Sequence, residues 1–211
     1  MWVLWGRSSS VNVQKVLWAL DELGLPYKQI EAGGRFGIVT SDHFARMNPT
    51  RRVPVLQDGE LTLWESEAIL RYLSAQTGQL MPHDPAARAV ADQWLAFGAT
   101  GLQPHFITLF WQRVRLPAAQ RDPVADAAAR VSLHKALEVM AGSWAQQEWL
   151  AGQDFGLPDI ALGALIYRIK ALDLLPSGHN GLDRWVAALH ARPAWQRRIA
   201  TSFEDLRAPA P

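Results

Sequence analysis

The 211-residue sequence contains no cysteine, which excludes disulfide bonds, thiolate metal sites and any cysteine nucleophile supplied by the chain itself. It also lacks a charge bias, since 21 lysines and arginines stand against 20 aspartates and glutamates, for a formal net charge of +1. Neither sign forms a long run, so the sequence predicts no nucleic-acid partner and no anionic membrane partner. If the protein carries out chemistry at sulfur, its ligand must bring the sulfur.

Long apolar runs and targeting signals are missing as well. No apolar run approaches the ~18 residues that indicate a membrane-spanning helix. The first residues, MWVLWGR, alternate like a strand and lack the charged start, apolar centre and small-residue cleavage site of a signal peptide. We therefore expect a cytoplasmic protein, and its 49% apolar residues supply enough core for one large domain or two small ones.

The first third of the chain alternates between strand and helix patterns. A helical pattern over residues 10–24 follows the first strand and ends at Gly24 and Pro26, and Asp58-Gly59 separates two short strand patterns as in a type I′ hairpin. A β-α-β opening joins parallel strands through a crossover helix, and the hairpin adds two more strands. A mixed four-stranded sheet with helices on its faces follows. The expected strands are residues 2–5, 27–32, 54–58 and 61–64, and the expected helices are residues 10–24, 41–47 and 65–78.

Strand signals stop near residue 80. Pro82 and Pro85 are typical of a linker followed by a helix start, and a long helix over residues 86–115 should be kinked by Pro104. The other expected helices are residues 122–150, 158–172, 181–192 and 193–203, of which 158–172 is apolar on nearly every face and should be the buried central helix. The core face of the 122–150 helix is expected to comprise Leu133, Leu137, Met140 and Trp144.

The resulting fold class is α/β plus all-α. We expect an amino-terminal domain over residues 1–80 with a four-stranded mixed sheet, a linker over residues 81–88, and an all-helical carboxy-terminal domain over residues 89–211.

Pro54 opens the third expected strand, which is an ordinary place for a proline, and only about 5–6% of X-Pro bonds in folded proteins are cis. The surrounding motifs change that expectation. They are Met47-Asn48-Pro49, Val53-Pro54, Glu65-Ser66, Ala68-Ile69, Tyr72-Leu73, DIALG at residues 159–163 and RPA at residues 192–194. In their order and spacing these motifs resemble the glutathione transferase family across most of the chain.

The resemblance implies a thioredoxin-like amino-terminal domain that binds glutathione, with Val53-Pro54 in the cis form. The backbone of Val53 would pair with the cysteinyl part of the tripeptide like an added strand. Glu65 would face the γ-glutamyl ammonium group, and Ser66 with the open N–H groups of a helix start would face its carboxylate. Both residues would also suit helix capping. Arg52 is a candidate partner of the glycyl carboxylate, and a solvent-facing loop arginine is the alternative.

The residue that stabilises the glutathione thiolate should lie at the start of the first helix, in RSSSVNVQKV. This stretch has no tyrosine, so the tyrosine-using classes of the family do not match. Ser10 falls where the serine and threonine classes place their hydroxyl, and Asn12 falls where bacterial members similar to the nu class carry asparagine. We favour Ser10, then Asn12, then Ser9, whereas an ordinary helix cap with loop serines is the structural alternative.

The resemblance further implies a small hydrophobic electrophile as the second substrate, with Phe106, Phe110 and Trp111 as candidate pocket residues; core packing is their alternative role. Glutathione would be a co-substrate, no permanently bound cofactor or metal is expected, and the family implies a homodimer. The expected activity is glutathione transfer. The alternatives are a glutathione-dependent disulfide reductase or peroxidase, and a non-catalytic regulatory or binding protein on the same fold.

Overall fold

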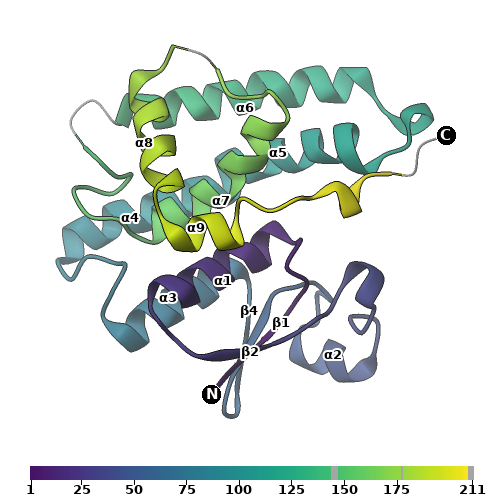
Figure 1. The fold of residues 1–211 in the computed structure, drawn as a ribbon, viewed down its shortest axis with the longest axis vertical. Coiled ribbons are helices and arrows are strands. Elements are labelled where there is room, and N and C mark those ends of the chain that lie inside the picture. The colour runs from purple at the N-terminus through teal and green to yellow at the C-terminus, as the bar shows by residue number, and fades with distance from the viewer. Residues whose placement is uncertain (144–146, 177, 209–211) are drawn as a thin grey trace. The chain divides into compact units, whose positions relative to one another are not determined.

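The computed structural model describes residues 1–143, 147–176 and 178–208, and the chain divides into two compact units (Figure 1). The N-terminal unit consists of residues 1–81 together with 193–201. The helical unit consists of residues 82–192 together with the segment that starts at residue 202. The sequence assigned residues 193–201 to the carboxy-terminal helices, whereas their contacts group them with the N-terminal unit.

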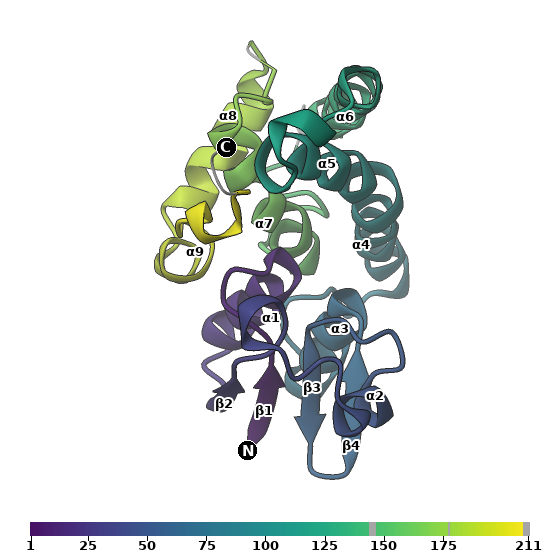
Figure 2. The ribbon, with the colours of Figure 1, turned by 90° about the vertical axis from the view of Figure 1, so that its right-hand side faces the viewer.

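The sheet of the N-terminal unit has the order β2-β1-β3-β4, which confirms the predicted four-stranded mixed sheet (Figure 2). Strand β1 runs parallel to β2 and antiparallel to β3, and β3 is antiparallel to β4. The strands are β1 (Trp2–Trp5), β2 (Tyr27–Ile30), β3 (Val55–Asp58) and β4 (Leu61–Trp64).

The hairpin between β3 and β4 differs in detail from its prediction. Asp58 pairs with Leu61, so the two loop residues are Gly59 and Glu60. Of these two, Gly59 has a positive φ of 58° and Glu60 does not. A positive φ at the first loop position alone is the pattern of a type II′ turn, so the predicted type I′ turn is wrong.

The helices of this unit are α1 (Val11–Glu22), α2 (Asp42–Met47), α3 (Ser66–Thr77) and α9 (Pro193–Arg198). Helices α1 and α3 pack together on one side of the sheet, with α2 apart from them (Figure 2). The paired residues Trp5 and Val55 pack with Phe44 and Met47 of α2. Because side chains alternate along a strand, the neighbouring buried residues of β1 and β3 face the α1 side.

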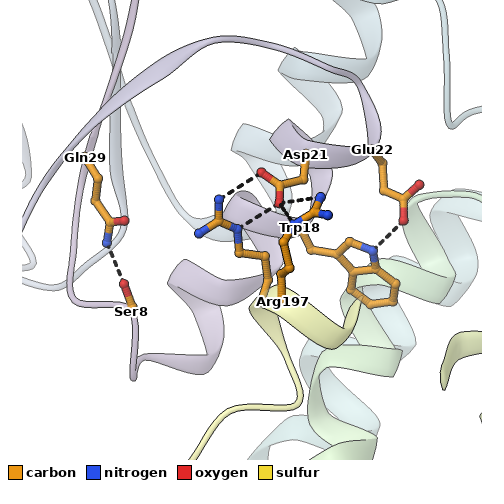
Figure 3. A network of polar contacts seen from close by, with 7 residues as sticks. Ser8, Trp18, Asp21, Glu22, Gln29 and Arg197 are labelled. Atoms are coloured by element: carbon orange, nitrogen blue, oxygen red, sulfur yellow. Dashed lines mark hydrogen bonds and ion pairs between the residues drawn. The ribbon is translucent and has the colours of Figure 1, made fainter. Parts of the chain in front are cut away.

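Helix α9 is joined to α1 by buried apolar and charged contacts. Trp195 is 1% exposed. The carboxylate of Asp21 on α1 accepts hydrogen bonds from Arg198 Nε at 2.9 Å and Arg197 Nη2 at 3.2 Å (Figure 3). Just beyond the helix, Gln14 Nε2 donates to Thr201 Oγ1 at 2.9 Å. Residues 193–201, the segment that returns from the end of the chain, are therefore an integral part of the N-terminal unit.

The helical unit surrounds α7, which is buried along nearly its whole length, as predicted. Among the described residues, no helix is long and apolar enough to cross a membrane. The helices are α4 (Pro85–Phe97), α5 (Gln103–Phe110), α6 (Pro123–Ser143), α7 (Leu157–Ala171) and α8 (Asn180–His190). Short 3₁₀ turns over Gly34–Phe36, Ala118–Gln120 and Glu204–Leu206 complete the two units.

The interruption expected at Pro104 takes the form of a π-helical turn, Gly98–Leu102, between α4 and α5. Pro104 follows this turn directly within a continuous helical run, and its missing N–H and its ring explain why the regular α-helical hydrogen bonds are interrupted here. Gly98 allows α7 to approach closely, since a Cβ there would lie 2.7 Å from Leu162 Cδ1. A second π-helical turn, Trp111–Arg115, ends this region.

The prediction for residues 122–150 is correct for most of the helix and wrong at its end. Helix α6 ends at Ser143, and Trp149 forms an isolated antiparallel bridge with Gly152. Leu150 instead donates its backbone N–H to Asp159 at 3.0 Å, which draws this segment to the start of α7. The predicted core residues Leu133, Leu137 and Met140 are buried, and Trp144 lies outside the described residues.

Candidate glutathione site

The Val53–Pro54 peptide bond is cis, as the sequence predicted. Within the described residues, no hydrogen bond reaches the backbone N–H or C=O of Val53. The loop before it is held by Asn48, which is 2% exposed and donates from Nδ2 to the C=O of Arg52 at 2.8 Å. A fixed backbone with an open N–H and C=O is what an extended peptide needs for strand-like pairing.

Gly6 brings Val53 close to the start of α1, and the sequence analysis did not identify it. This glycine has a φ of 154°, and a Cβ there would lie 2.4 Å from Val13 Cγ2 and 3.3 Å from Val53 Cβ. A side chain at residue 6 would therefore separate Val53 from α1. The turn between β1 and α1 and the loop that contains the cis-proline therefore lie next to each other.

Helix α1 begins with Ser10 as its N-cap residue, in extended conformation with φ −86° and ψ 122°. The Ser10 side chain makes no capping hydrogen bond among the described residues, so its hydroxyl does not fill the usual cap role. Ser9 is half-buried, and Ser8 accepts a hydrogen bond from Gln29 Nε2 at 3.0 Å (Figure 3). Asn12 Oδ1 is buried and has no hydrogen-bond partner within the part of the chain that the structure describes.

Glu65 occupies the N-cap position of α3 with a positive φ of 69°. Such a conformation is uncommon for a residue other than glycine, and it persists where the surrounding structure holds it, often at functional sites. The expectation that Glu65 also caps the helix is wrong, since its side chain makes no capping hydrogen bond among the described residues. The backbone of Glu65 is therefore held in one conformation, and its exposed carboxylate does not cap the helix.

Ser66 begins α3 and is 2% exposed. Its hydroxyl lies 2.7 Å from Glu67 Oε2, and Glu67 Oε1 lies 2.6 Å from Nζ of Lys15, which is 1% exposed. Burial alone would raise the pKa of Glu67, but the charge and hydrogen bond of Lys15 and the hydrogen bond from Ser66 hold that pKa below its ordinary value. Glu67 is therefore an ionised, largely buried carboxylate directly beside Ser66, and the sequence analysis missed it.

Three arginines lie near the cis-proline loop in different surroundings. Arg52 is exposed, whereas Arg51 donates to backbone carbonyl groups of the loop before α2, including that of Thr40. Arg7, which the sequence analysis did not single out, lies beside Val53: a Cβ at Gly33 would be 3.4 Å from Arg7 Nη1 and 3.5 Å from Val53 Cγ2. Close approach of the Arg7 side chain to Gly33 explains why a glycine suits this position.

The three aromatic residues suggested for the second substrate lie in the helical unit, in two different environments. Phe106 is 0% and Phe110 3% exposed, with their rings 5.6 Å apart, so both are packed in the core of that unit. Trp111 is 47% exposed, and the guanidinium of Arg115 lies 5.4 Å from its ring centroid. Within the described residues, no group of three or more histidine, aspartate or glutamate side chains is placed to hold a metal ion.

The N-terminal unit, with its cis-proline, open Val53 backbone and polar start of α3, defines a thioredoxin-like domain, and an all-helical unit follows it. Two family models match: glutathione S-transferase, N-terminal domain, over residues 2–75, and glutathione S-transferase, C-terminal domain, over residues 102–193. The chain belongs to the glutathione S-transferase family.

Individual relatives agree with this assignment along nearly the whole chain. The sequence is 40% identical to glutathione S-transferase GstB of Escherichia coli K12 over 203 residues, which are 94% of this chain and 98% of that protein. The fold is similar to that of the theta class glutathione S-transferase from Xanthomonas axonopodis pv. citri with glutathione bound, with a TM-score of 0.90, 40% identity, and coverage of 95% of this chain and 98% of that one. A second similar structure, a glutathione transferase from Burkholderia graminis, has a TM-score of 0.84, 28% identity and two glutathione molecules bound per subunit, with 96% and 88% coverage.

Proposed function

We propose that this protein binds glutathione in the N-terminal unit and activates its thiol for attack on small hydrophobic electrophiles. The observation that carries the proposal is the backbone of Val53, beside a cis-proline and unpaired within the described part of the chain, which is 40% identical to a structure with glutathione bound. In this arrangement Val53 pairs with the cysteinyl backbone, and the exposed carboxylate of Glu65 attracts the γ-glutamyl ammonium group.

Ser10 is our choice for the residue that stabilises the thiolate. A free thiol titrates near ~8.5, so lowering its pKa by one to two units requires about 1.4 to 2.7 kcal/mol of preference for the anion. A hydrogen bond to a charged acceptor contributes ~1.5 to 3 kcal/mol, and a helix N-terminus adds ~0.3 to 1 kcal/mol. The Ser10 hydroxyl at the start of α1 supplies both terms, and Asn12 and then Ser9 are the second and third choices.

The remaining assignments follow from charge and exposure. Arg52 and Arg7 are the candidates for the glycyl carboxylate, since both carry a cation and flank Val53 along the chain or in space. Trp111 is the strongest of the three aromatic candidates for the electrophile, because its side chain is half-exposed whereas Phe106 and Phe110 are buried. We also propose a cytoplasmic homodimer.

Retention on immobilised glutathione, followed by elution with free glutathione, tests the binding step. Turnover of chlorodinitrobenzene, compared with reduction of a small disulfide by glutathione, tests the reaction. We expect retention and conjugation. Binding with disulfide reduction alone would favour the reductase alternative, and failure to bind would favour a non-catalytic role.

A further inference from the structure

The second π-helical turn, Trp111–Arg115, places an aromatic ring and a cation side by side in the helical unit. Leu116 donates its backbone N–H to the C=O of Trp111 at 2.9 Å, which closes the wide turn of a π-helix. In this turn the Arg115 guanidinium lies over the Trp111 ring, 5.4 Å from its centroid. Trp111 is 47% exposed and Arg115 is half-buried. Single π-helical turns are frequent at functional sites, so this pair is a candidate for ligand binding.

The two arginines of this turn differ in how their charge is compensated. Arg113 donates two hydrogen bonds to the carboxylate of Asp126, each 2.9 Å long, and these bonds raise the pKa of Arg113. Arg115 forms no hydrogen bond and no ion pair within the part of the chain that the structure describes. Burial lowers the pKa of Arg115, and the carboxylate of Asp205 acts in the opposite direction. A partly desolvated guanidinium whose N–H donors have no acceptor is a group that a ligand oxyanion would complete.

The segment near the end of the described chain holds this turn in place. The C=O of Val114, which is 1% exposed, accepts a hydrogen bond from the backbone N–H of Ala208 at 2.8 Å. Asp205 lies in the 3₁₀ turn Glu204–Leu206, and its exposed carboxylate acts on Arg115 without forming an ion pair with it. The backbone beside Arg115 is therefore fixed, while the nearby acidic group leaves the guanidinium N–H groups unoccupied.

We propose that Trp111 and Arg115 select electrophiles that combine an aromatic ring with a carboxylate group. This inference rests on the proposed glutathione transfer and names the class of its second substrate. The exposed part of the Trp111 indole offers an apolar surface for a planar ring, and the Arg115 guanidinium offers a fork of N–H groups that matches a carboxylate. Arg115 is thus a specificity-determining residue that contacts a part of the substrate where no bond is made or broken.

The reaction on such a substrate needs no further reactant. For an aryl chloride, the glutathione thiolate attacks the ring carbon that carries chlorine, a C–S bond forms, and chloride leaves with the electron pair of the C–Cl bond. The thiol proton passes to solvent when the thiolate forms, and the substrate carboxylate is unchanged. Because this carboxylate has the same charge in the ground state and the transition state, Arg115 should affect KM more than kcat.

The test compares two aryl chlorides of similar shape, 4-chloro-3-nitrobenzoate and its neutral amide, 4-chloro-3-nitrobenzamide. Conjugation of each with glutathione by the full chain gives kcat/KM, and the ratio of the carboxylate value to the amide value cancels differences in glutathione binding. Arg115→Gln should lower this ratio roughly tenfold, mainly through a higher KM for the carboxylate, because a hydrogen bond to a charged acceptor is lost. Asp205→Asn removes the opposing charge at an exposed position and should raise the ratio about twofold.

Arg130→Gln is the matched control, since it removes the same charge from an exposed position on α6 of the same unit. We expect it to leave the ratio unchanged. An unchanged ratio in Arg115→Gln, or an equal decrease in Arg130→Gln, would overturn the inference. If Arg115→Gln does not fold, an unchanged ratio in Asp205→Asn would overturn it instead.

Calorimetric binding of 4-nitrobenzoate and 4-nitrobenzamide, which have no chloride to lose, separates this inference from the proposed function. If neither chloride is conjugated but 4-nitrobenzoate binds more weakly to Arg115→Gln than to the wild type, the proposed function fails and the carboxylate site stands. If the amide is conjugated and neither the kinetic ratio nor the binding of 4-nitrobenzoate depends on Arg115, this inference alone fails.

Discussion

At the scale of single residues, the serines before α1 differ in their surroundings, so the role that we propose for one of them can be tested against another. Ser8 is tied to Gln29 of β2, whereas Ser10 begins α1 without using its side chain as a cap among the described residues. These serines lie close to the cis-proline loop, because Gly6 allows Val53 to approach α1. Ser10 and Gly6 can each be tested against a control residue of the same type, Ser8 and Gly142.

Ser10→Ala should raise the pKa of the glutathione thiol in the complex by one to two units and lower turnover at neutral pH by about tenfold or more, because the thiolate loses its hydrogen bond. The thiolate absorbance of the binary complex as a function of pH measures the first quantity, and conjugation kinetics measure the second. Ser8→Ala is the matched control and should leave both unchanged. An unshifted thiol pKa with full activity in Ser10→Ala would transfer the role to Asn12 or Ser9.

Gly6→Ala should destabilise the N-terminal unit by about 2 kcal/mol or more, because the new Cβ would overlap Val13 and strain the backbone at φ 154°. Chemical denaturation measures this change. Gly142→Ala, in α6 with no atom within 4 Å of the added Cβ, should instead stabilise the protein by roughly 0.5–1 kcal/mol. Equal effects of the two substitutions would contradict the close approach at Gly6.

At the scale of elements, the start of α7 depends on one buried carboxylate. Asp159 is 0% exposed and accepts from the backbone N–H of Leu150 and Gly156, both at 3.0 Å, and from Trp185 Nε1 at 2.7 Å. The N-cap residue is Gly156, which has no side chain to cap the helix, so the side-chain part of the cap comes from Asp159. Burial raises its pKa to about 6, against the opposing effect of the hydrogen bonds that the carboxylate accepts.

A carboxyl group whose pKa is raised on folding stabilises the fold fully below its unfolded pKa and loses that contribution as pH rises through the folded pKa. The wild type should therefore lose stability, relative to Asp159→Asn, between about pH 4 and pH 6, by at most about 3 kcal/mol. Urea unfolding of both proteins across this range measures the difference. The variant should be less stable overall, because its amide offers one acceptor oxygen where donors contact both oxygens of the carboxylate. A constant difference from pH 4 to pH 7 would contradict the raised pKa.

At the scale of the whole molecule, the chain returns to its first unit near its end. Trp195 and Ile199, each 1% exposed, and the arginines that bind Asp21 join residues 193–201 to α1. The thioredoxin-like unit is therefore incomplete without a segment from the far end of the sequence.

Truncation after Arg192 should expose the α1 surface that α9 covers and abolish glutathione binding, since loss of the buried Trp195 alone costs about 3–5 kcal/mol. Truncation after Thr201 retains this segment and should preserve binding. Calorimetric titration of both truncated proteins with glutathione measures the contrast. Tight binding by the shorter protein would show that the returning segment is dispensable.

Several parts of the fold could be predicted because local chemistry controls them. The four strands, the mixed sheet and the buried α7 follow from apolar periodicity and turn residues, and the cis form of Val53–Pro54 followed from the resemblance. The end of α6 could not be predicted, because Leu150 continues the helical pattern and is diverted by a hydrogen bond to Asp159. The type II′ turn was missed because Asp58 belongs to the strand ladder and not to the loop.

The sequence by itself determined the absence of protein thiols, the division into an α/β and an all-helical part, the family, and the stretch in which we propose the glutathione site. These depend on composition, periodicity and motif order, which are local properties of the chain. Tertiary structure decided that residues 193–201 complete the N-terminal unit and that Lys15 and Glu67 lie behind Ser66. These features depend on contacts between residues far apart in sequence. A buried charge such as that of Lys15 is stabilised by an opposite charge, and only the tertiary structure shows which residue provides it.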